Sequence, residues 1–185
     1  MEIFEAMARN AIDTITFRHD FKKGMVITEP EIWIPEQSDF IKKVLTQRGE
    51  GHEKLIFHYR PEVNLKVISN IHDSILGFPL GGSRMRNDYE NEEAAIIDVA
   101  DLSEGMSGKG YWTGTGTSGG KNVLIGDPEK DKTPKFLEAY GDFLEKVGCI
   151  ITGEDMNFSS DDCSIAARRT KFMTGTKEKN RRSFS

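Results

Sequence analysis

Apolar and β-branched runs alternate along the chain with amphipathic segments of helical spacing, and turn-forming residues separate them. The runs that predict strands cover residues 14–17, 25–27, 54–59, 65–71, 123–125 and 149–152. The predicted helices are a short segment around residues 3–7, a segment from Ser38 to near Gly49, and three later ones that begin at Asn91, at Thr133 and at Ser159 or Ser160. This alternation predicts an α/β domain.

Capping residues and glycines define the ends of the later helices. Asn91 is a predicted N-cap, and Thr133 precedes Pro134, the arrangement typical of a helix start. Three glycines at positions 105, 108 and 110 predict that the helix after Asn91 frays there, and Gly148 is expected to end the next one. Because a crossover helix joins consecutive strands in this second half, part of the sheet is expected to be parallel.

Composition narrows the classes of partner. The 185 residues include 25 Lys plus Arg and 30 Asp plus Glu, which gives a net charge of −5. This charge argues against nucleic acids and anionic membranes as binding partners. No apolar run approaches the roughly 18 residues of a membrane helix, and the acidic N-terminus does not resemble a secretory leader. We therefore expect a cytoplasmic protein. Two cysteines and four histidines show no metal-ligand spacing, so no metal site is expected.

Residues 114–119 spell G-x-G-x-x-G, the pattern of dinucleotide-binding loops. That interpretation requires a strand before the loop and a helix after it, whereas here the predicted order is reversed. A phosphate-binding P-loop ending at Lys121 fails as well, because Thr115 stands where that motif needs glycine and Asn122 where it needs Ser or Thr. The chain is therefore not expected to bind a nucleotide cofactor.

Lys121 remains, at the lip of a predicted strand and reached through a loop of small residues that leaves room for a ligand. Lys109 lies twelve residues earlier; both are either pocket residues or solvated surface lysines. Asp155 follows the predicted strand 149–152, where it could exchange protons with a lysine or simply form a cap or turn. Gly81 and Gly82 could offer bare amides to an anion, and a plain turn is the alternative.

Together these segments resemble the N-terminal domain of the Glu/Leu/Phe/Val dehydrogenases, nearest the leucine, phenylalanine and tryptophan branch. The matching segments are Gly51-His52-Glu53-Lys54, Ile71-His72-Asp73-Ser74, Leu76-Gly77, Leu80-Gly81-Gly82-Ser83-Arg84-Met85, Glu92-Glu93-Ala94, Gly105-Met106-Ser107-Gly108-Lys109, Gly119-Gly120-Lys121, Ile125-Gly126-Asp127-Pro128, Ala139-Tyr140-Gly141 and Thr152-Gly153-Glu154-Asp155. They cover residues 51 to about 179, with residues 1–7 in addition. The resemblance implies a three-layer α/β/α domain with a mixed sheet.

The resemblance also assigns roles to the candidate residues. Lys109, with Gly81 and Gly82, would hold the carboxylate of an α-amino acid or 2-oxo acid. Lys121, as a neutral amine, would activate water and handle protons in oxidative deamination, with Asp155 assisting. The family uses NAD and oligomerises through this domain, and we expect the hairpin over residues 54–71 to leave sheet edges that pair between subunits.

The chain departs from the family pattern at several places. Residues 10–50 are a predicted insertion, and Ser118 and residues 108–112 alter the usual loop. Asp155-Met156-Asn157 replaces the commoner Asp-Val-Gly. We expect residues 1–174 to form the substrate-binding and oligomerisation domain and 175–185 a basic linker, with the Rossmann domain of the family absent.

The leading hypothesis is therefore the substrate-binding and oligomerisation domain of an NAD-dependent amino acid dehydrogenase. NAD would bind only if a separate nucleotide-binding domain were supplied, and the chain alone is not expected to be catalytically competent. The alternative is a stand-alone, non-catalytic module that binds amino acids or serves in assembly.

Overall fold

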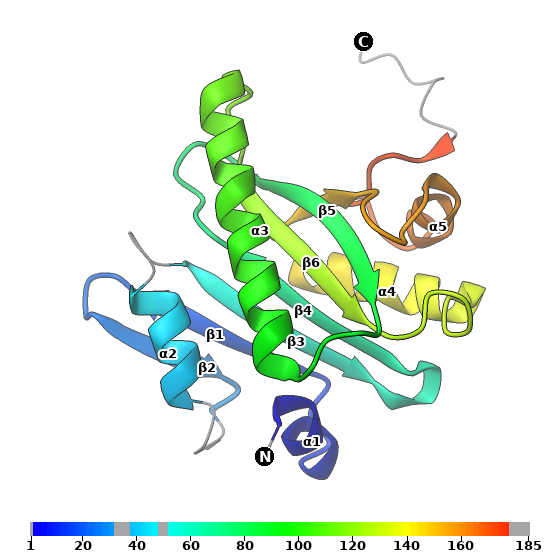
Figure 1. Ribbon diagram of the computed structural model, residues 1–185, viewed down its shortest axis with the longest axis horizontal. Coiled ribbons are helices and arrows are strands. Elements are labelled where there is room, and N and C mark those ends of the chain that lie inside the picture. Colours follow the sequence, from blue (N-terminus) through cyan, green and yellow to red (C-terminus); the bar gives the residue numbers. More distant parts are fainter. Residues whose placement is uncertain (1, 32–37, 48–51, 178–185) are drawn as a thin grey trace.

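The computed structural model describes residues 2–31, 38–47 and 52–177 (Figure 1). The elements are α1 (Ile3–Arg9), β1 (Thr14–Asp20), β2 (Met25–Glu29), α2 (Ser38–Gln47), β3 (Lys54–Arg60), a 3-10 turn (Pro61–Val63), β4 (Leu65–Ile71), β5 (Pro79–Arg86), α3 (Glu92–Thr113), β6 (Ser118–Ile125), α4 (Pro134–Val147), β7 (Ile151–Gly153) and α5 (Ser160–Ala166). The predicted end of α2 near Gly49 lies outside the described residues.

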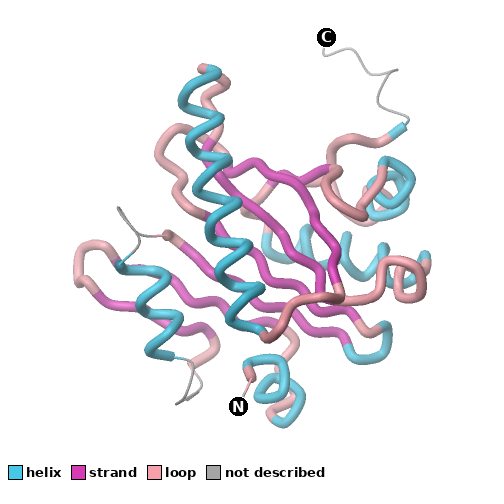
Figure 2. The backbone as a smooth tube through the Cα atoms, viewed as in Figure 1, coloured by secondary structure: helices cyan, strands magenta, loops and turns pink. Residues whose placement is uncertain are grey.

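The described strands form one mixed sheet in the order β2-β1-β3-β4-β6-β5-β7 (Figure 2). Neighbouring strands from β2 to β6 run antiparallel, whereas β5 runs parallel to both β6 and β7. The predicted parallel portion in the second half is confirmed. One strand was not predicted: β5 carries Gly81 and Gly82, which therefore lie inside a strand and not in a turn.

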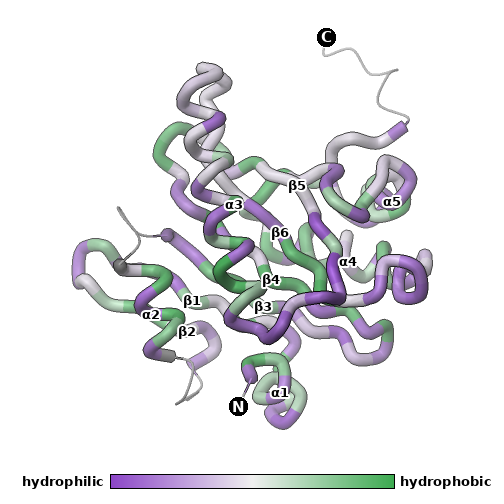
Figure 3. Tube along the Cα trace, in the orientation of Figure 1, coloured by the Kyte–Doolittle hydropathy of each residue, from purple (hydrophilic) through white to green (hydrophobic). Residues whose placement is uncertain are grey.

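Helices cover both faces of this sheet, so the three-layer α/β/α architecture is confirmed (Figure 1). One hydrophobic core joins α1, α2 and α3 to the sheet, and a second core lies under α4 and α5. Adjacent residues of β6 show the alternation, since Val123 belongs to the first core and Leu124 to the second. Hydrophobic stretches run along the central strands, and polar stretches lie in the outer turns (Figure 3).

The predicted helix starts are confirmed by their caps. Asn91 accepts a hydrogen bond from the backbone N–H of Ala94 at 2.9 Å, and Thr133 accepts one from Phe136 at 3.2 Å. Ser159 forms a reciprocal capping box with Asp162.

The predicted fraying of α3 at its glycines is wrong. This helix continues to Thr113 and ends at Gly114, whose φ is +65°. Gly110 is needed for packing, because a methyl group there would lie 2.2 Å from the carbonyl oxygen of Thr117. The returning chain supports the last turns of the helix and outweighs the weak helix propensity of glycine.

The hairpin over residues 54–71 does not leave the open sheet edges that we predicted. β3 pairs with β1 on one side and with β4 on the other, and β4 pairs with β6. The hairpin of β1 and β2 covers what would otherwise be the edge, so that β2 is the outer strand on this side of the described sheet.

Candidate active site

Lys121 and Asp155 are brought into direct contact. Lys121 is the fourth residue of β6 and lies inside the strand, not at its lip. Its Nζ lies 2.6 Å from Oδ2 of Asp155, which follows β7 after one residue. The lysine side chain is 7% exposed and that of the aspartate 26%, so the pair is shielded from solvent on most sides. A buried amine beside a carboxylate has the composition of a proton-transfer site.

The glycine pair of β5 explains how the two side chains meet. β5 lies between β6 and β7, and therefore brings together the elements that contribute the lysine and the aspartate. A methyl group on Gly82 would lie 3.0 Å from Nζ of Lys121 and 2.8 Å from Cβ of Asp155. A methyl group on Gly81 would lie 1.7 Å from the carbonyl oxygen of Gly120. Gly82 therefore leaves the space of the polar pair open, and Gly81 permits close approach of two backbones.

Arg84, a residue that sequence reasoning did not single out, is a second cation at Asp155. Its Nε donates to Oδ2 of Asp155 at 3.1 Å, and its Nη1 lies 3.3 Å from Oδ1 of Asp98 on α3. Strand periodicity offers a signal, since Arg84 is two residues beyond Gly82 and faces the same side of the sheet. The partner Asp98 is visible only in the folded chain.

These contacts set the charge of Asp155. Burial by itself raises the pKa of this carboxyl, but the hydrogen bond and charge of Lys121, with the charge of Arg84, hold the pKa below its ordinary value. Asp155 is therefore ionised at neutral pH and can accept a hydrogen bond or a proton.

Lys109 is not part of this pair. It lies four residues before the end of α3, and its side chain is exposed. Among the described residues its ammonium forms no ion pair. The adjacent Gly110 packs on the chain that leads into β6.

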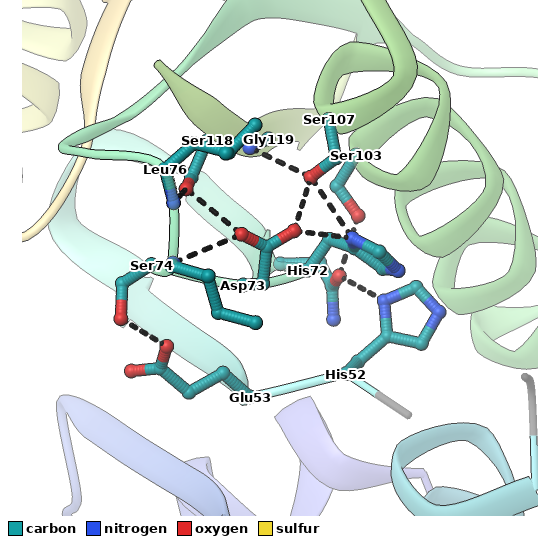
Figure 4. A network of polar contacts seen from close by, with 12 residues as sticks. His52, Glu53, His72, Asp73, Ser74, Leu76, Ser103, Ser107, Ser118 and Gly119 are labelled. Carbon is teal, nitrogen blue, oxygen red and sulfur yellow. Dashed lines mark hydrogen bonds and ion pairs between the residues drawn. The ribbon is translucent and has the colours of Figure 1, made fainter. Parts of the chain in front are cut away.

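A hydrogen-bonded network centred on Asp73 joins α3 to the start of β6 (Figure 4). Oδ2 of Asp73 accepts from Ser107 at 2.6 Å, and Oδ1 accepts from Ser118 at 2.8 Å. Ser107 in turn accepts from the backbone N–H of Gly119 at 2.8 Å. Ser107 lies two residues before Lys109 in the sequence, and Ser118 lies three residues before Lys121. Sequence reasoning noted Ser118 as unusual but did not identify its partner Asp73.

Two of the four histidines belong to the same region. His72 Nδ1 lies 2.8 Å from Oδ2 of Asp73, and the buried His52 lies 2.8 Å from Oδ1 of Asn70. A cavity of about 720 Å³ opens beside His72, between the turn after β1 and residues 72–75. Neither Lys121 nor Asp155 lines that cavity, and the candidate site is therefore defined by the polar contacts of this pair.

Two negative observations apply to the described part of the chain. No group of three or more His, Cys, Asp and Glu side chains there is arranged to hold a metal ion. None of the helices seen in residues 2–31, 38–47 and 52–177 has the length and apolar character required to cross a bilayer.

Comparisons with known proteins agree with this architecture. The family model for the Glu/Leu/Phe/Val dehydrogenase dimerisation domain matches residues 61–179. A phenylalanine dehydrogenase of Lysinibacillus sphaericus is 43% identical over 133 residues, which are 71% of this chain and 35% of that protein. A leucine dehydrogenase of Bacillus subtilis (strain 168) is 42% identical over 125 residues, 67% of this chain and 34% of the relative.

A solved structure shows the same fold. The crystal structure of L-tryptophan dehydrogenase from Nostoc punctiforme superimposes with a TM-score of 0.64 and 35% identity, over 72% of this chain and 38% of that one. The chain thus spans about a third of the length of the curated relatives it matches.

Proposed function

Because the chain belongs to the Glu/Leu/Phe/Val dehydrogenase family, we propose that it supplies the substrate-binding domain of an amino acid dehydrogenase. The reaction would be oxidative deamination of an α-amino acid to a 2-oxo acid. The observation that supports this most is the 2.6 Å contact of Lys121 with Asp155 above Gly82.

In this proposal the residues of the chain bind substrate and handle protons. Lys121 first passes a proton to the ionised Asp155 and, as the free amine, then takes a proton from the water that attacks the substrate carbon. Asp155 holds the ammonium before and after this exchange. The absence of a side chain at Gly82 leaves space at the lysine nitrogen.

We assign the substrate carboxylate to Lys109 and to the backbone at Gly81 and Gly82. In the described sheet the two glycines have no partner in β6 and pair with Thr152 and Gly153 of β7. The missing side chain at Gly82 leaves the backbone there open toward Nζ of Lys121, which supports a role of this position in binding an anion. The exposed ammonium of Lys109 is unengaged by any described carboxylate and is therefore available to a ligand.

The loop at residues 114–119 lacks the structural context that a nicotinamide cofactor requires. The G-x-G-x-x-G sequence at residues 114–119 follows α3 and leads into β6, the reverse of the strand-loop-helix order that presents a pyrophosphate to a helix N-terminus. We propose that NAD, the hydride acceptor, is held by a separate nucleotide-binding domain.

A fusion tests this function. The nucleotide-binding domain of a related dehydrogenase is joined after Lys179, and NADH formation is followed with a panel of amino acids. We expect amino-acid-dependent turnover that Lys121→Ala abolishes, whereas Lys130→Ala, at an 80% exposed lysine, leaves it unchanged. A folded fusion that binds amino acids without turnover would instead favour the non-catalytic binding module.

A further inference from the structure

The carboxylate of Asp155 is shared between two cations. Oδ2 lies 2.6 Å from Nζ of Lys121 and accepts from Nε of Arg84 at 3.1 Å. Two cations on one oxygen lie within about 6 Å of each other, where like charges repel strongly enough to change protonation. The arginine thus influences the pair without a direct role in proton transfer.

The guanidinium of Arg84 is itself held by a second carboxylate. Its Nη1 lies 3.3 and 3.4 Å from the two oxygens of Asp98, and the hydroxyl of Tyr89 donates to Oδ2 of Asp98 at 2.6 Å. The side chains of Arg84 and Asp98 are 15% and 23% exposed, so the contacts are largely shielded from solvent. With each of its ends on a different carboxylate, the guanidinium is fixed in orientation.

We propose that Arg84 is a positioning residue of this site. Anchored on Asp98, it fixes the orientation of the Asp155 carboxylate and, together with Lys121, balances the negative charge of that carboxylate. The inference deepens the proposed function, because it assigns Arg84 and Asp98 to the control of the same proton-handling pair.

Charges alternate along this line of contacts. Lys121 comes from β6, Asp155 from the segment after β7, Arg84 from β5 and Asp98 from α3, while the neutral hydroxyl of Tyr89 ends the line. Loss of the arginine charge leaves Asp155 with one cation, which makes the carboxylate easier to protonate. Loss of the Asp98 charge does the opposite, because Arg84 is then available to Asp155 alone.

The test uses the 185-residue chain and carbon-13 NMR titration of the Asp155 carboxyl, assigned with Asp155→Asn. We expect Arg84→Gln to raise the pKa of Asp155 by about 1, and Asp98→Asn to lower it. Arg86→Gln is the matched control, because this arginine lies on the same strand face and pairs with Asp88, at 2.7 Å. It also stacks on the ring of Tyr89, but it contacts neither Asp155 nor Asp98. This control variant should leave the titration of Asp155 near that of the wild type.

A double variant separates positioning from distant charge. In the Arg84→Gln background, Asp98→Asn should change the pKa of Asp155 much less than it does in the wild type. An effect of equal size in both backgrounds, shifts of the same sign in the two single variants, or no difference between Arg84→Gln and Arg86→Gln would overturn the proposal. If Arg84→Gln does not fold, Asp98→Asn decides alone, and a rise or no change in the pKa of Asp155 refutes it.

The measurement needs no turnover, so the two proposals fail separately. The expected shifts together with an inactive fusion would refute the dehydrogenase function and keep Arg84 as the positioning residue. Activity without those shifts would do the reverse.

Discussion

Ser107 on α3 and Asp73, two residues beyond β4, share a hydrogen bond of 2.6 Å that fastens the helix to the sheet beside the candidate site. The same aspartate accepts a hydrogen bond from Ser118 at the start of β6, so one carboxylate connects three segments that are distant in sequence. Lys109 and Lys121 lie on two of these segments. Their separation therefore depends on a residue that touches neither lysine.

Replacement of Asp73 tests this connection. In Asp73→Asn an amide donor replaces one of the two accepting oxygens, so either Ser107 or Ser118 faces a donor. We expect the free energy of unfolding to fall by about 1–3 kcal/mol, the cost of breaking hydrogen bonds to a partly buried charged group. Chemical denaturation measures this, and Asp39→Asn, whose side chain is 81% exposed, is the control that should change stability little. Equal stabilities of the two variants would contradict the role of Asp73.

The pH dependence of stability offers a second test at this residue. Burial tends to raise the pKa of Asp73, but hydrogen bonds from Ser107, Ser118 and other donors hold it below the ordinary value of 3.8. A carboxyl whose pKa is lowered by folding stabilises the folded state above its unfolded pKa, and this contribution is lost as the pH falls through the folded pKa. The stability gap between wild type and Asp73→Asn should therefore be full near neutral pH and narrow below about pH 4. A gap that widens in acid would show that the carboxylate is not the stabilising form.

Local patterns predicted most of the elements, and the failures share one physical cause. Asn91 and Thr133 were predictable as caps because their effect is confined to one helical turn. Gly81, Gly82 and Gly110 indicated turns or fraying, since glycine disfavours regular structure on its own. In the folded chain each lies where another segment leaves no room for a side chain, a property that depends on residues far along the sequence.

The candidate site was predictable to the same extent. The resemblance pointed to Lys121 and Asp155, and the fold places them in contact. Arg84 and Asp98 are 14 positions apart on a strand and a helix, and nothing in their local sequence indicates that they meet.

Replacement of glycine by alanine should have opposite effects at Gly82 and at Gly105. Gly82→Ala adds a methyl group within 3.0 Å of both members of the Lys121–Asp155 pair, so we expect it to displace them and to abolish amino acid binding. Gly105→Ala adds one on α3 with no atom within 4 Å, and should raise the stability of the chain by up to about 1 kcal/mol through helix propensity. Calorimetric titration and thermal melting of both variants check this pair. Unchanged binding by Gly82→Ala would argue against a ligand at this pair.

Self-association is expected at the outer edge of the sheet. The described sheet ends at β2 on one side and at β7 on the other. Residues 172–174 flank β7, where the backbone of Thr152 forms hydrogen bonds with Phe172 and Thr174. On the opposite side β2 has no further neighbour among the described strands, and such an edge offers backbone groups to a second chain. We expect a dimer or larger assembly in light scattering at tens of micromolar protein. A monomer at that concentration would contradict this expectation.

The role of Lys109 is the least constrained by contacts and the easiest to test. Its exposed ammonium has no described carboxylate partner, so its removal should cost no folding energy and the melting temperature should stay unchanged. If it clamps the substrate carboxylate, Lys109→Ala should weaken binding of amino acids or 2-oxo acids by about 1.5–3 kcal/mol, the range of hydrogen bonds to charged groups. That corresponds to a loss of about 10- to 150-fold in affinity, measurable by calorimetric titration of the 185-residue chain. Lys135→Ala, an exposed lysine on α4, is the matched control and should bind as the wild type does. Equal binding by the two variants would return Lys109 to the status of a surface lysine, because a carboxylate held by its charge cannot be indifferent to the loss of that charge.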